Sequence, residues 1–216
     1  ESQDSAVKSL KAQQTAQTRE RICKVALKLF NENGTAKTTT HDIAHAAEIS
    51  PGNLYYHFKN KEEIIRELFK EMDIYSTEKW YLLGPVNPKV GIMDFMRFVT
   101  RNFASYRFFF REFSTLLKAD PVLAGYWKHV YEKLFLAMQE SAERWVKAGI
   151  LKPFASSFER DAFIENFWTI ANFSTVHLEA KGKKTKADQD QSFRLLLQFL
   201  HPYHTAKGQR AIELHY

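Results

Sequence analysis

The fold is decided by the stretch TTHDIAHAAEISPGNLYYHFKNKEE, residues 39–63. Thr39 is followed three residues later by Asp42, a spacing that resembles a capping box and marks the start of a helix. The pattern therefore predicts a short helix over residues 40–47. Small apolar side chains at positions 43, 44 and 47 would give this helix one buried face.

A second short helix follows after a turn of about three residues. Ser50 is a favoured N-cap, and Pro51 occupies the first helical position, where an N–H group would have no partner within the helix. Leu54 and Phe58 lie four residues apart, so they share one inward face. A helix, a turn and a helix with polar and aromatic residues outward form the helix-turn-helix arrangement that enters the DNA major groove.

The sequence before this motif predicts a polar arm and a first helix. Residues 1–17 are rich in Ser, Gln, Lys and Ala, and we expect a frayed arm there. The alternative is a basic arm that touches the minor groove or phosphates, as in some DNA-binding domains. From Thr18 apolar residues recur at helical intervals, and Gly34 fits a left-handed C-terminal cap.

The sequence after the motif predicts a helix that two domains share. Asn60 and Glu63 form a further capping pair, which starts a helix over residues 61–79. Its first turns carry the apolar pattern of the helix-turn-helix region, and its later turns are aromatic like the sequence that follows. We therefore place the domain boundary inside this helix, near Glu71, without a flexible linker.

At these residues the sequence resembles a known family. The block SPGNLYYHFKNKEE at 50–63 is similar to the DNA-binding signature of the TetR family of bacterial transcription regulators, and the resemblance runs from about Thr18 to Leu68. It implies an all-α fold with an N-terminal three-helix helix-turn-helix DNA-binding domain over 18–70 and a C-terminal helical ligand-binding and dimerisation domain over 71–204. Glu48 stands where the turn often has Gly, and a left-handed conformation costs Glu roughly 1 kcal/mol.

Candidate DNA contacts follow from side-chain chemistry and from this resemblance. The amide of Asn53 can read an adenine edge, and Gly52 allows the backbone to approach closely. The start of the preceding helix offers free N–H groups to a phosphate. Tyrosine and histidine rings offer donors to phosphate and faces to thymine methyl groups. The full set is Thr40, His41, Gly52, Asn53, Tyr55, Tyr56, His57 and Lys61. The alternative for either tyrosine is a partly buried role in the core.

The remainder of the chain predicts further helices and no strand. Asn87 caps a helix that carries an apolar stripe, and an unusually aromatic segment follows it. Asp120 starts a helix that need not stop before Gly149, a length on the order of 40 Å. The last predicted helix ends before Pro202, and residues 205–216 are expected to form a loosely held tail.

Aromatic residues are unusually frequent in the C-terminal region, and the resemblance implies an effector pocket there. Most aromatic residues at helical spacing are simply core, but a helical domain with this much aromatic area can enclose an apolar site with a few orienting polar groups. The candidates are Tyr75, Phe98, Arg101, Phe109, Phe113, Tyr126, Trp127, His129, Tyr131, Phe135, Trp168 and Asn172. Few charges accompany them, which favours an apolar or amphipathic effector such as a fatty acyl or an aromatic compound.

The resemblance also implies a homodimer that reads a near-palindromic operator in double-stranded DNA. Two helix-turn-helix motifs about 34–36 Å apart would contact successive major grooves. Two C-terminal helices, over 158–180 and 190–201, would pair into a four-helix bundle. The candidate interface residues are Phe163, Phe167, Thr175, Leu178, Phe193, Leu197 and Leu200. We expect a repressor that the effector releases from DNA.

Composition bounds these interpretations without identifying the partner. The 216 residues are 44% hydrophobic and carry a net charge of +6, but the first eighty hold twelve basic and twelve acidic residues. A dimer could still present the basic residues that precede the motif, namely Lys8, Lys11, Arg19, Arg21, Lys24 and Lys28, to phosphates. No apolar run approaches the ~20 residues of a membrane span. The single cysteine, Cys23, fits a reducing compartment, and we expect a cytoplasmic protein.

Catalytic and metal chemistry have little support in the sequence. There is no Gly-rich phosphate loop and no nucleophile elbow, and no paired carboxylates lie in an apolar context, so we expect neither an enzyme nor a cofactor. His41 and His45 have the spacing of a helical metal pair, but His41 already belongs to the phosphate-facing helix start. The alternative function is a helical carrier of lipid or acyl groups, or an interaction protein, without sequence-specific DNA binding.

Overall fold

A computed structural model of the chain describes residues 2–83, 92–182 and 186–213, and it describes side chains for residues 7, 9–72, 96–182 and 190–210. These residues form helices, short connections and one isolated bridge between Leu151 and His204, so the all-α prediction is confirmed. The chain has two compact units, residues 1–71 and 72–216, which divide within α4 (Lys61–Leu83). None of the helices in the described ranges combines the length and apolar character needed to cross a membrane.

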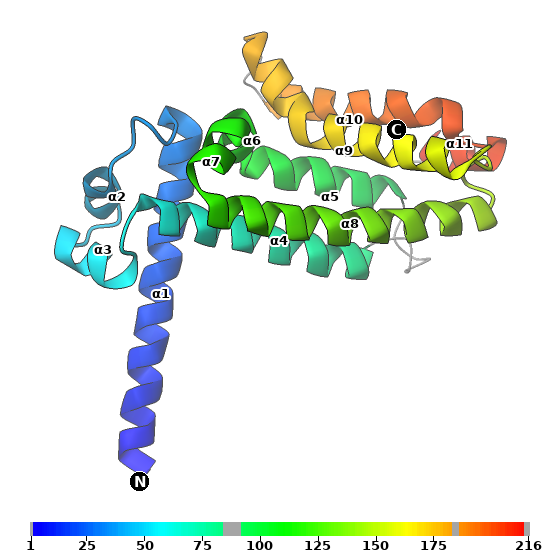
Figure 1. Cartoon of the computed structure of the whole chain (residues 1–216). Coiled ribbons are helices and arrows are strands. Elements are labelled where there is room, and N and C mark those ends of the chain that lie inside the picture. The colour runs from blue at the N-terminus through cyan, green and yellow to red at the C-terminus, as the bar shows by residue number, and fades with distance from the viewer. Residues whose placement is uncertain (1, 84–91, 183–185, 214–216) are drawn as a thin grey trace. The chain divides into compact units, whose positions relative to one another are not determined.

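The first unit is a small helical domain around one apolar core. It contains α1 (Ser2–Asn33), α2 (Thr40–Ala46), α3 (Pro51–His57) and the first turns of α4 (Figure 1). Helices α1, α2 and α3 contact one another. Fully buried side chains fill the space between these elements, namely Ile22, Phe30, Ile43, Leu54, Phe58, Ile64 and Leu68. The predicted inward face of Leu54 and Phe58 is confirmed, and burial of this face holds the two short helices in place.

Helix α1 begins much earlier than the frayed arm predicted for residues 1–17. Residues 2–17 continue the helix, although most of their described side chains are exposed, including Val7 and Leu10. Extending an existing helix costs far less than nucleating one, and Ala, Gln, Lys and Leu are good helix formers. The prediction of disorder weighed the missing apolar face and neglected this propagation. At the other end, Gly34 has a φ of 82°, as expected for a left-handed cap.

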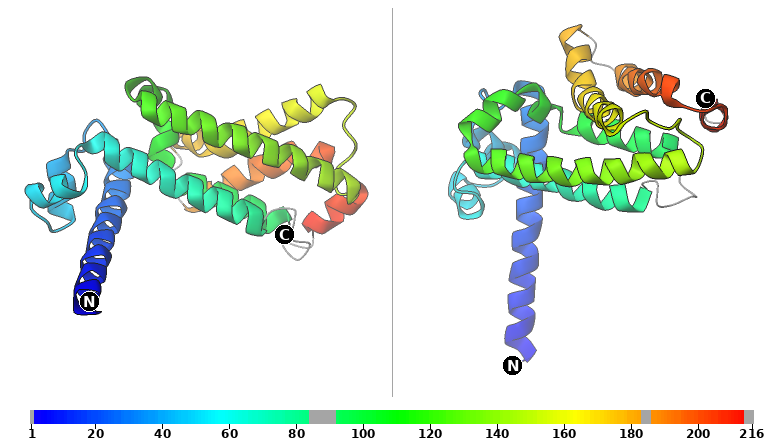
Figure 2. Two further views of the ribbon diagram at one scale, coloured as in Figure 1. Left: turned by 60° about the horizontal axis from the view of Figure 1, so that its bottom comes forward. Right: turned by 45° about the vertical axis from the view of Figure 1, so that its right-hand side comes forward.

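The second unit is a bundle of helices, and α9 and α10 lie side by side within it (Figures 1 and 2). Helices α5 and α8 also pack against α9, and α5 reaches α10. Its elements after α4 are α5 (Ile92–Ser105), α6 (Arg107–Arg111), α7 (Phe113–Ala119), α8 (Pro121–Lys147), α9 (Ser157–Ala180), α10 (Lys186–Leu200), the 3-10 turn η1 (His201–Tyr203) and α11 (Ala206–Glu213). The predicted cap Asn87 lies outside the described residues.

Local capping explains where the two longest helices of this unit begin. The Asp120 carboxylate accepts hydrogen bonds from the backbone N–H groups of Val122 and Leu123, so α8 starts where the sequence predicted. Ser156 caps α9 by accepting from the Glu159 N–H. Such caps satisfy donors that have no partner within the helix, which fixes each start to one residue.

Residues 205–210 are docked, which corrects this part of the prediction of a loosely held tail over 205–216; residues 214–216 lie outside the described part. The Thr205 hydroxyl donates to the Gly149 carbonyl at 2.6 Å, and its N–H donates to the Ile150 carbonyl at 3.0 Å. Lys207 Nζ reaches the Ala148 carbonyl at 2.8 Å. Gly208 is buried so tightly that a Cβ there would lie 2.3 Å from the Ile150 oxygen. Helix α11 therefore packs on the connection that follows α8.

Candidate nucleic-acid interface and ligand site

The helix-turn-helix is held by hydrogen bonds between residues close in sequence. The Thr39 hydroxyl accepts from the Asp42 N–H, and the Asp42 carboxylate accepts from the Thr39 N–H at 2.8 Å. The capping box is therefore complete. The Thr39 hydroxyl also donates to the Asp42 carboxylate at 2.6 Å. This bond first, and the bond from the Thr39 N–H second, hold the pKa of Asp42 below its ordinary value, since both stabilise the carboxylate. Between the helices, Glu48 has a φ of 55°, the left-handed conformation foreseen for this non-glycine turn residue.

Helix α3 presents an exposed polar and aromatic face. Tyr55 is 52% exposed and Tyr56 is 78% exposed, whereas Leu54 between this face and the core is fully buried. Neither tyrosine is therefore a core residue. Gly52 and Asn53 at the start of α3 are also exposed. This is the geometry that a recognition helix needs, with its first turn and one side open to a groove.

The structure brings the starts of the two short helices together through one contact. The Thr40 hydroxyl on α2 and the Tyr55 hydroxyl on α3 lie 3.0 Å apart, within hydrogen-bond distance. The contact fixes the direction of an exposed tyrosine ring. Two hydroxyls at one point on the surface can together bind a single phosphate oxygen. His41, next to Thr40, is exposed on the same helix start.

His57 is less open than its neighbours on α3. Its Nδ1 atom is buried and has no hydrogen-bond partner among the described residues, and its ring meets Tyr56 edge-on at 5.1 Å. Burial, and secondarily the positive charge of Arg19, hold the pKa of the His57 imidazole below its ordinary value. The lowered pKa favours the neutral imidazole, which can offer a phosphate one N–H donor but no positive charge.

Arg19 has a structural role that the sequence did not indicate. Its guanidinium donates to the His57 carbonyl at 2.6 Å, lies 4.1 Å from the centre of the Phe58 ring and pairs with Glu67 at 3.2 Å. One side chain thus joins α1 to the end of α3 and to α4. Because it is half-buried in these contacts, Arg19 is a poor member of the basic set expected to meet phosphates.

Lys61 is also committed to the protein. Its ammonium donates to the Thr35 carbonyl at 2.6 Å and to the Thr38 carbonyl at 3.1 Å. It therefore anchors the loop between α1 and α2, in addition to the phosphate contact that the sequence predicts for it. The capping pair that starts its helix is confirmed, because the Asn60 side chain accepts from the Glu63 N–H and the Glu63 carboxylate accepts from the Lys59 N–H.

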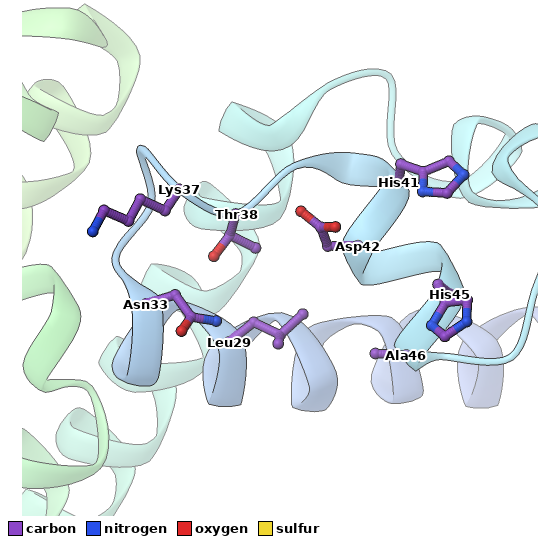
Figure 3. A pocket seen from close by; sticks show the side chains of 8 residues that line it. All are labelled: Leu29, Asn33, Lys37, Thr38, His41, Asp42, His45 and Ala46. Atoms are coloured by element: carbon purple, nitrogen blue, oxygen red, sulfur yellow. The ribbon is translucent and has the colours of Figure 1, made fainter.

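A shallow polar pocket of about 580 Å³ lies between the end of α1 and α2 (Figure 3). It is lined by Leu29, Asn33, Lys37, Thr38, His41, Asp42, His45 and Ala46. The Asp42 carboxylate in it is already bound to Thr39. No cluster of three or more His, Cys, Asp or Glu side chains that could hold a metal occurs among the described residues. Its lining places Lys37, His41 and His45 beside the helix-turn-helix.

The second unit brings five of the twelve predicted effector residues together in one aromatic cluster. Phe109 and Phe113 contact Trp127, Trp127 stacks on Tyr131, and Tyr131 contacts Phe135. Phe98 is half-buried, whereas Arg101, Tyr126 and His129 are exposed, and the side chain of Tyr75 lies outside the described part. The cluster links α6, the start of α7 and the first half of α8 into one aromatic wall.

Three buried polar atoms on α9 have no hydrogen-bond partner in the part of the chain that is described. Ser174 Oγ lies two positions after Asn172 and therefore on the opposite side of the helix. The other two are Trp168 Nε1 and Asn172 Oδ1, on side chains that are 6% and 4% exposed. Both residues lie on α9, one turn apart, and the Trp168 ring is 5.8 Å from that of Phe103 on α5. A buried polar atom without a partner is unfavourable by about 1–3 kcal/mol. Such a pair indicates a place where an absent molecule would complete the bonding.

Tyr131 has a different polar environment from the rest of the aromatic cluster. Its hydroxyl donates to the Glu165 carboxylate on α9. Burial first, and this carboxylate second, raise the pKa of Tyr131 above its ordinary value, so the phenol stays protonated. Further along the same helix pair, Gln139 donates to Asp161 at 2.9 Å. These bonds fix α8 against α9 on the solvent side of the wall.

The seven predicted dimer-interface residues are covered within a single chain. All are at most 9% exposed, and they pack α9 against α10 and the neighbouring helices. An apolar stripe on a helix predicts that the stripe is buried, but it does not indicate which element covers it. Here the chain's own helices cover it. The sides of α9 and α10 that stay exposed carry Phe158, at 81%, and polar residues such as Asn166, Thr169, Arg194 and Gln198. A second copy would have to use these residues.

Two family models together match most of the chain, from the second half of α1 onward. A model described as bacterial regulatory proteins, tetR family, matches residues 22–68. A model described as bacterial transcriptional repressor matches residues 84–212, which is more than half of the chain.

Individual relatives agree with these matches. A TetR-family transcriptional regulator from Marinobacter aquaeolei VT8 has a solved structure that is 30% identical, with a TM-score of 0.77 over 91% of this chain and 96% of that one. The regulator QacR of Staphylococcus aureus is 42% identical over 62 residues, which are 29% of this chain and 33% of QacR. The regulator AcrR of Shigella flexneri is 38% identical over 58 residues, 27% of each chain. The matches to these two curated relatives therefore span a third or less of their length.

Proposed function

The chain belongs to the TetR family of bacterial regulatory proteins, and we propose that it represses transcription by binding a near-palindromic DNA operator as a homodimer. Its relatives are transcriptional regulators rather than enzymes. We further propose that it acts in the cytoplasm and that a small, mostly apolar effector releases it from the operator.

The observation that supports DNA binding most directly is the exposed face of α3. Asn53, Tyr55 and Tyr56 are open to solvent, while Leu54 and Phe58 fix the helix from behind. In the proposed complex α3 enters the major groove, and the Asn53 amide reads a base edge. Thr40 and Tyr55, whose hydroxyls meet at 3.0 Å, bind one phosphate together and set the register of the helix on the duplex.

A homodimer supplies the specificity that one motif lacks. A single helix-turn-helix contacts few base pairs, whereas two of them on one face of the duplex read two half-sites. The exposed sides of α9 and α10 are the proposed contact between the two copies. Phe158, a large apolar side chain that is 81% exposed, would be covered there.

Effector control requires that the ligand bind one arrangement of the dimer better than the other. Helix α4 runs without interruption from Lys61 to Leu83 through the division between the two units. Its first residues are held in the DNA-binding unit by Lys61, which donates hydrogen bonds to the loop before α2. We propose that the effector shifts α4 and thereby changes the spacing of the two α3 helices.

Mutation of Tyr55 tests the proposal. Operator DNA is first selected from random duplexes with the full-length protein, and binding is then measured by fluorescence anisotropy at fixed salt, because phosphate contacts make affinity salt-dependent. Tyr55→Ala should abolish specific binding, and Tyr55→Phe should weaken it through loss of the hydroxyl alone. The matched control Tyr126→Ala removes an exposed tyrosine of α8 and should leave binding unchanged.

The oligomeric state of each variant is measured in parallel by native mass spectrometry. All variants should remain dimeric, since none of these residues lies on the proposed dimer surface. Specific DNA binding retained by Tyr55→Ala would disprove the contact assignment. Failure of the wild-type protein to enrich any sequence would disprove the regulator function itself.

A further inference from the structure

The pair of unpartnered polar atoms on α9 restricts the chemistry of the effector. Trp168 Nε1 is a hydrogen-bond donor only, and Asn172 Oδ1 is an acceptor only. The two residues are four positions apart on one helix, so both side chains lie on the same face, with Cα atoms about 6 Å apart along the axis. One donor and one acceptor thus occupy adjacent places in an otherwise apolar interior.

The surroundings of this pair are aromatic and uncharged. Phe103 packs against Trp168, Phe103 contacts Phe110, and Phe110 in turn contacts Trp127 and Phe173. Among the buried polar residues described in this unit, the one carboxylate is that of Asp120, and it is already occupied in capping α8. No buried lysine, arginine or glutamate stands among the described side chains of the unit. A charged ligand would therefore lose its hydration without gaining a counter-charge.

We propose that Trp168 and Asn172 are the polar recognition pair of the effector site, and that the effector is an uncharged aromatic molecule bearing a hydroxyl group. The hydroxyl oxygen accepts from Trp168 Nε1–H, and the hydroxyl hydrogen goes to Asn172 Oδ1. The aromatic body packs against the Phe103 side of the cluster. This assignment rests on the proposed regulator function, because the bound molecule is an effector only if it controls DNA binding.

One donor beside one acceptor disfavours the acyl ligands that the sequence also allowed. A carboxylate or an ester offers acceptors alone, so it could pair with Trp168 but would leave Asn172 Oδ1 unpaired or repelled. A quaternary ammonium group offers no hydrogen bond and needs a carboxylate or an open aromatic cage. A hydroxyl satisfies both orphaned atoms with a single group. Sites built to bond a hydroxyl reject analogues that lack it, because their own polar groups are then left unpaired.

Three small probes of similar shape test the inference on the full-length protein without DNA. They are phenol, toluene, in which a methyl group replaces the hydroxyl, and benzoate, which adds a negative charge. Binding is followed by the ¹⁵N-indole resonance of Trp168, assigned by its loss in Trp168→Phe. Phenol should shift this resonance in the direction of a stronger hydrogen bond and should bind at least about tenfold more tightly than toluene or benzoate.

Variants identify the acceptor. Asn172→Leu keeps the shape of the side chain but removes its oxygen, and it should abolish the preference for phenol over toluene. The same change at Asn166, an exposed residue of the same helix, should leave the preference intact. Ligand-free Asn172→Leu should unfold at the same or a higher temperature than wild type, because an unpaired buried atom has been removed. That result shows that its loss of selectivity is not a folding defect.

Four outcomes would overturn the proposal. Equal binding of phenol and toluene, tighter binding of benzoate, absence of any shift at Trp168, or a preference for phenol that survives Asn172→Leu would each refute it. Retention of selected DNA is measured separately with and without phenol. A protein that binds phenol at Trp168 but never binds DNA would refute the regulator function and leave the recognition pair standing.

Discussion

At the scale of single residues, Gly52 separates the needs of folding from those of DNA binding. It lies in the first turn of α3, is exposed, and a Cβ there would meet only the Ser50 hydroxyl, at 4.0 Å. Gly52→Ala should therefore stabilise the protein by about 0.5–1 kcal/mol, as alanine does in a helix. If the backbone approaches DNA here, the added methyl group should weaken operator binding about tenfold, which corresponds to 1.4 kcal/mol.

Urea unfolding and anisotropy on selected DNA measure the two effects of Gly52→Ala. Gly125→Ala in α8, where a Cβ would meet nothing within 4 Å, is the matched control. It should give a similar gain in stability with unchanged DNA affinity. Unchanged affinity in Gly52→Ala would show that α3 meets DNA through side chains alone.

His204 makes stability depend on pH. Its side chain is 1% exposed, both ring nitrogens lack a partner among the described residues, and burial, then the nearby His201, lowers its pKa to about 4. The native state thus binds fewer protons than the unfolded state, where the pKa is about 6.5. Stability should be complete above pH 6.5 and should fall by about 2 kcal/mol between pH 7 and pH 5 from this group alone.

The variant His204→Leu should lose that part of the pH dependence. Urea unfolding of wild type and variant at the two pH values measures the difference. His201→Leu, which removes an exposed neighbouring histidine, should keep most of it. Parallel pH profiles for wild type and His204→Leu would show that this imidazole finds a partner or reaches solvent.

At the scale of elements, α11 depends on one close approach of two backbones. A Cβ on Gly208 would lie 2.3 Å from the Ile150 carbonyl oxygen, and backbone cannot move aside as a side-chain end can. Gly208→Ala should therefore displace α11 and destabilise the second unit by about 1–3 kcal/mol, the usual range for overpacking. Hydrogen exchange should rise at the N–H groups of Thr205 and Lys152, which donate to the Ile150 and Tyr203 carbonyls across this contact.

A displaced helix must be distinguished from a general loss of stability. Hydrogen exchange in α1 to α3 should stay unchanged, because these helices belong to the other unit. Protection of the Thr205 and Lys152 N–H groups that survives Gly208→Ala would mean that α11 is not held by this contact.

Structural features that depend on residues close in sequence were predicted, whereas features that depend on residues far apart in sequence were not. The caps at Thr39, Ser50 and Asp120 depend on neighbours within four residues, and the sequence predicted each of them. The resemblance also marked Glu48 as a non-glycine residue at a turn position that often has Gly, and its conformation is left-handed. The docking of α11 depends on residues more than fifty positions away, such as Gly149. Nothing in the composition of the last residues indicates that contact, so a loose tail was predicted instead.

The same distinction applies within the candidate site. The outward position of Tyr55 follows from the inward position of Leu54, and periodicity is enough to predict it. The partners of Arg19 and Lys61 lie on other elements, so their structural roles could not be read from charge alone. Likewise, an apolar stripe on α9 predicts burial, but periodicity does not distinguish cover by the same chain from cover by a second copy.

At the scale of the whole molecule, the proposal requires that two copies act on one DNA. Each protomer alone contributes one short α3, so most of the operator affinity should come from joining two weak contacts. A duplex with one half-site should bind about a hundredfold or more weakly than the full operator. Inserting about five base pairs between the half-sites turns one of them to the opposite face of the helix, and it should weaken binding to the level of the single half-site.

Anisotropy titrations on the three duplexes measure this bivalency, and the same insertion placed outside the palindrome controls for DNA length. Phe158→Asp on the exposed side of α9 should reduce the full operator to the affinity of a half-site, because it places a charge on the proposed dimer surface. It should leave binding to the half-site duplex unchanged, since α3 is intact. If the full operator and the half-site bind wild type equally, recognition belongs to the single chain, and the change in α3 spacing proposed for effector release has no dimer to act on.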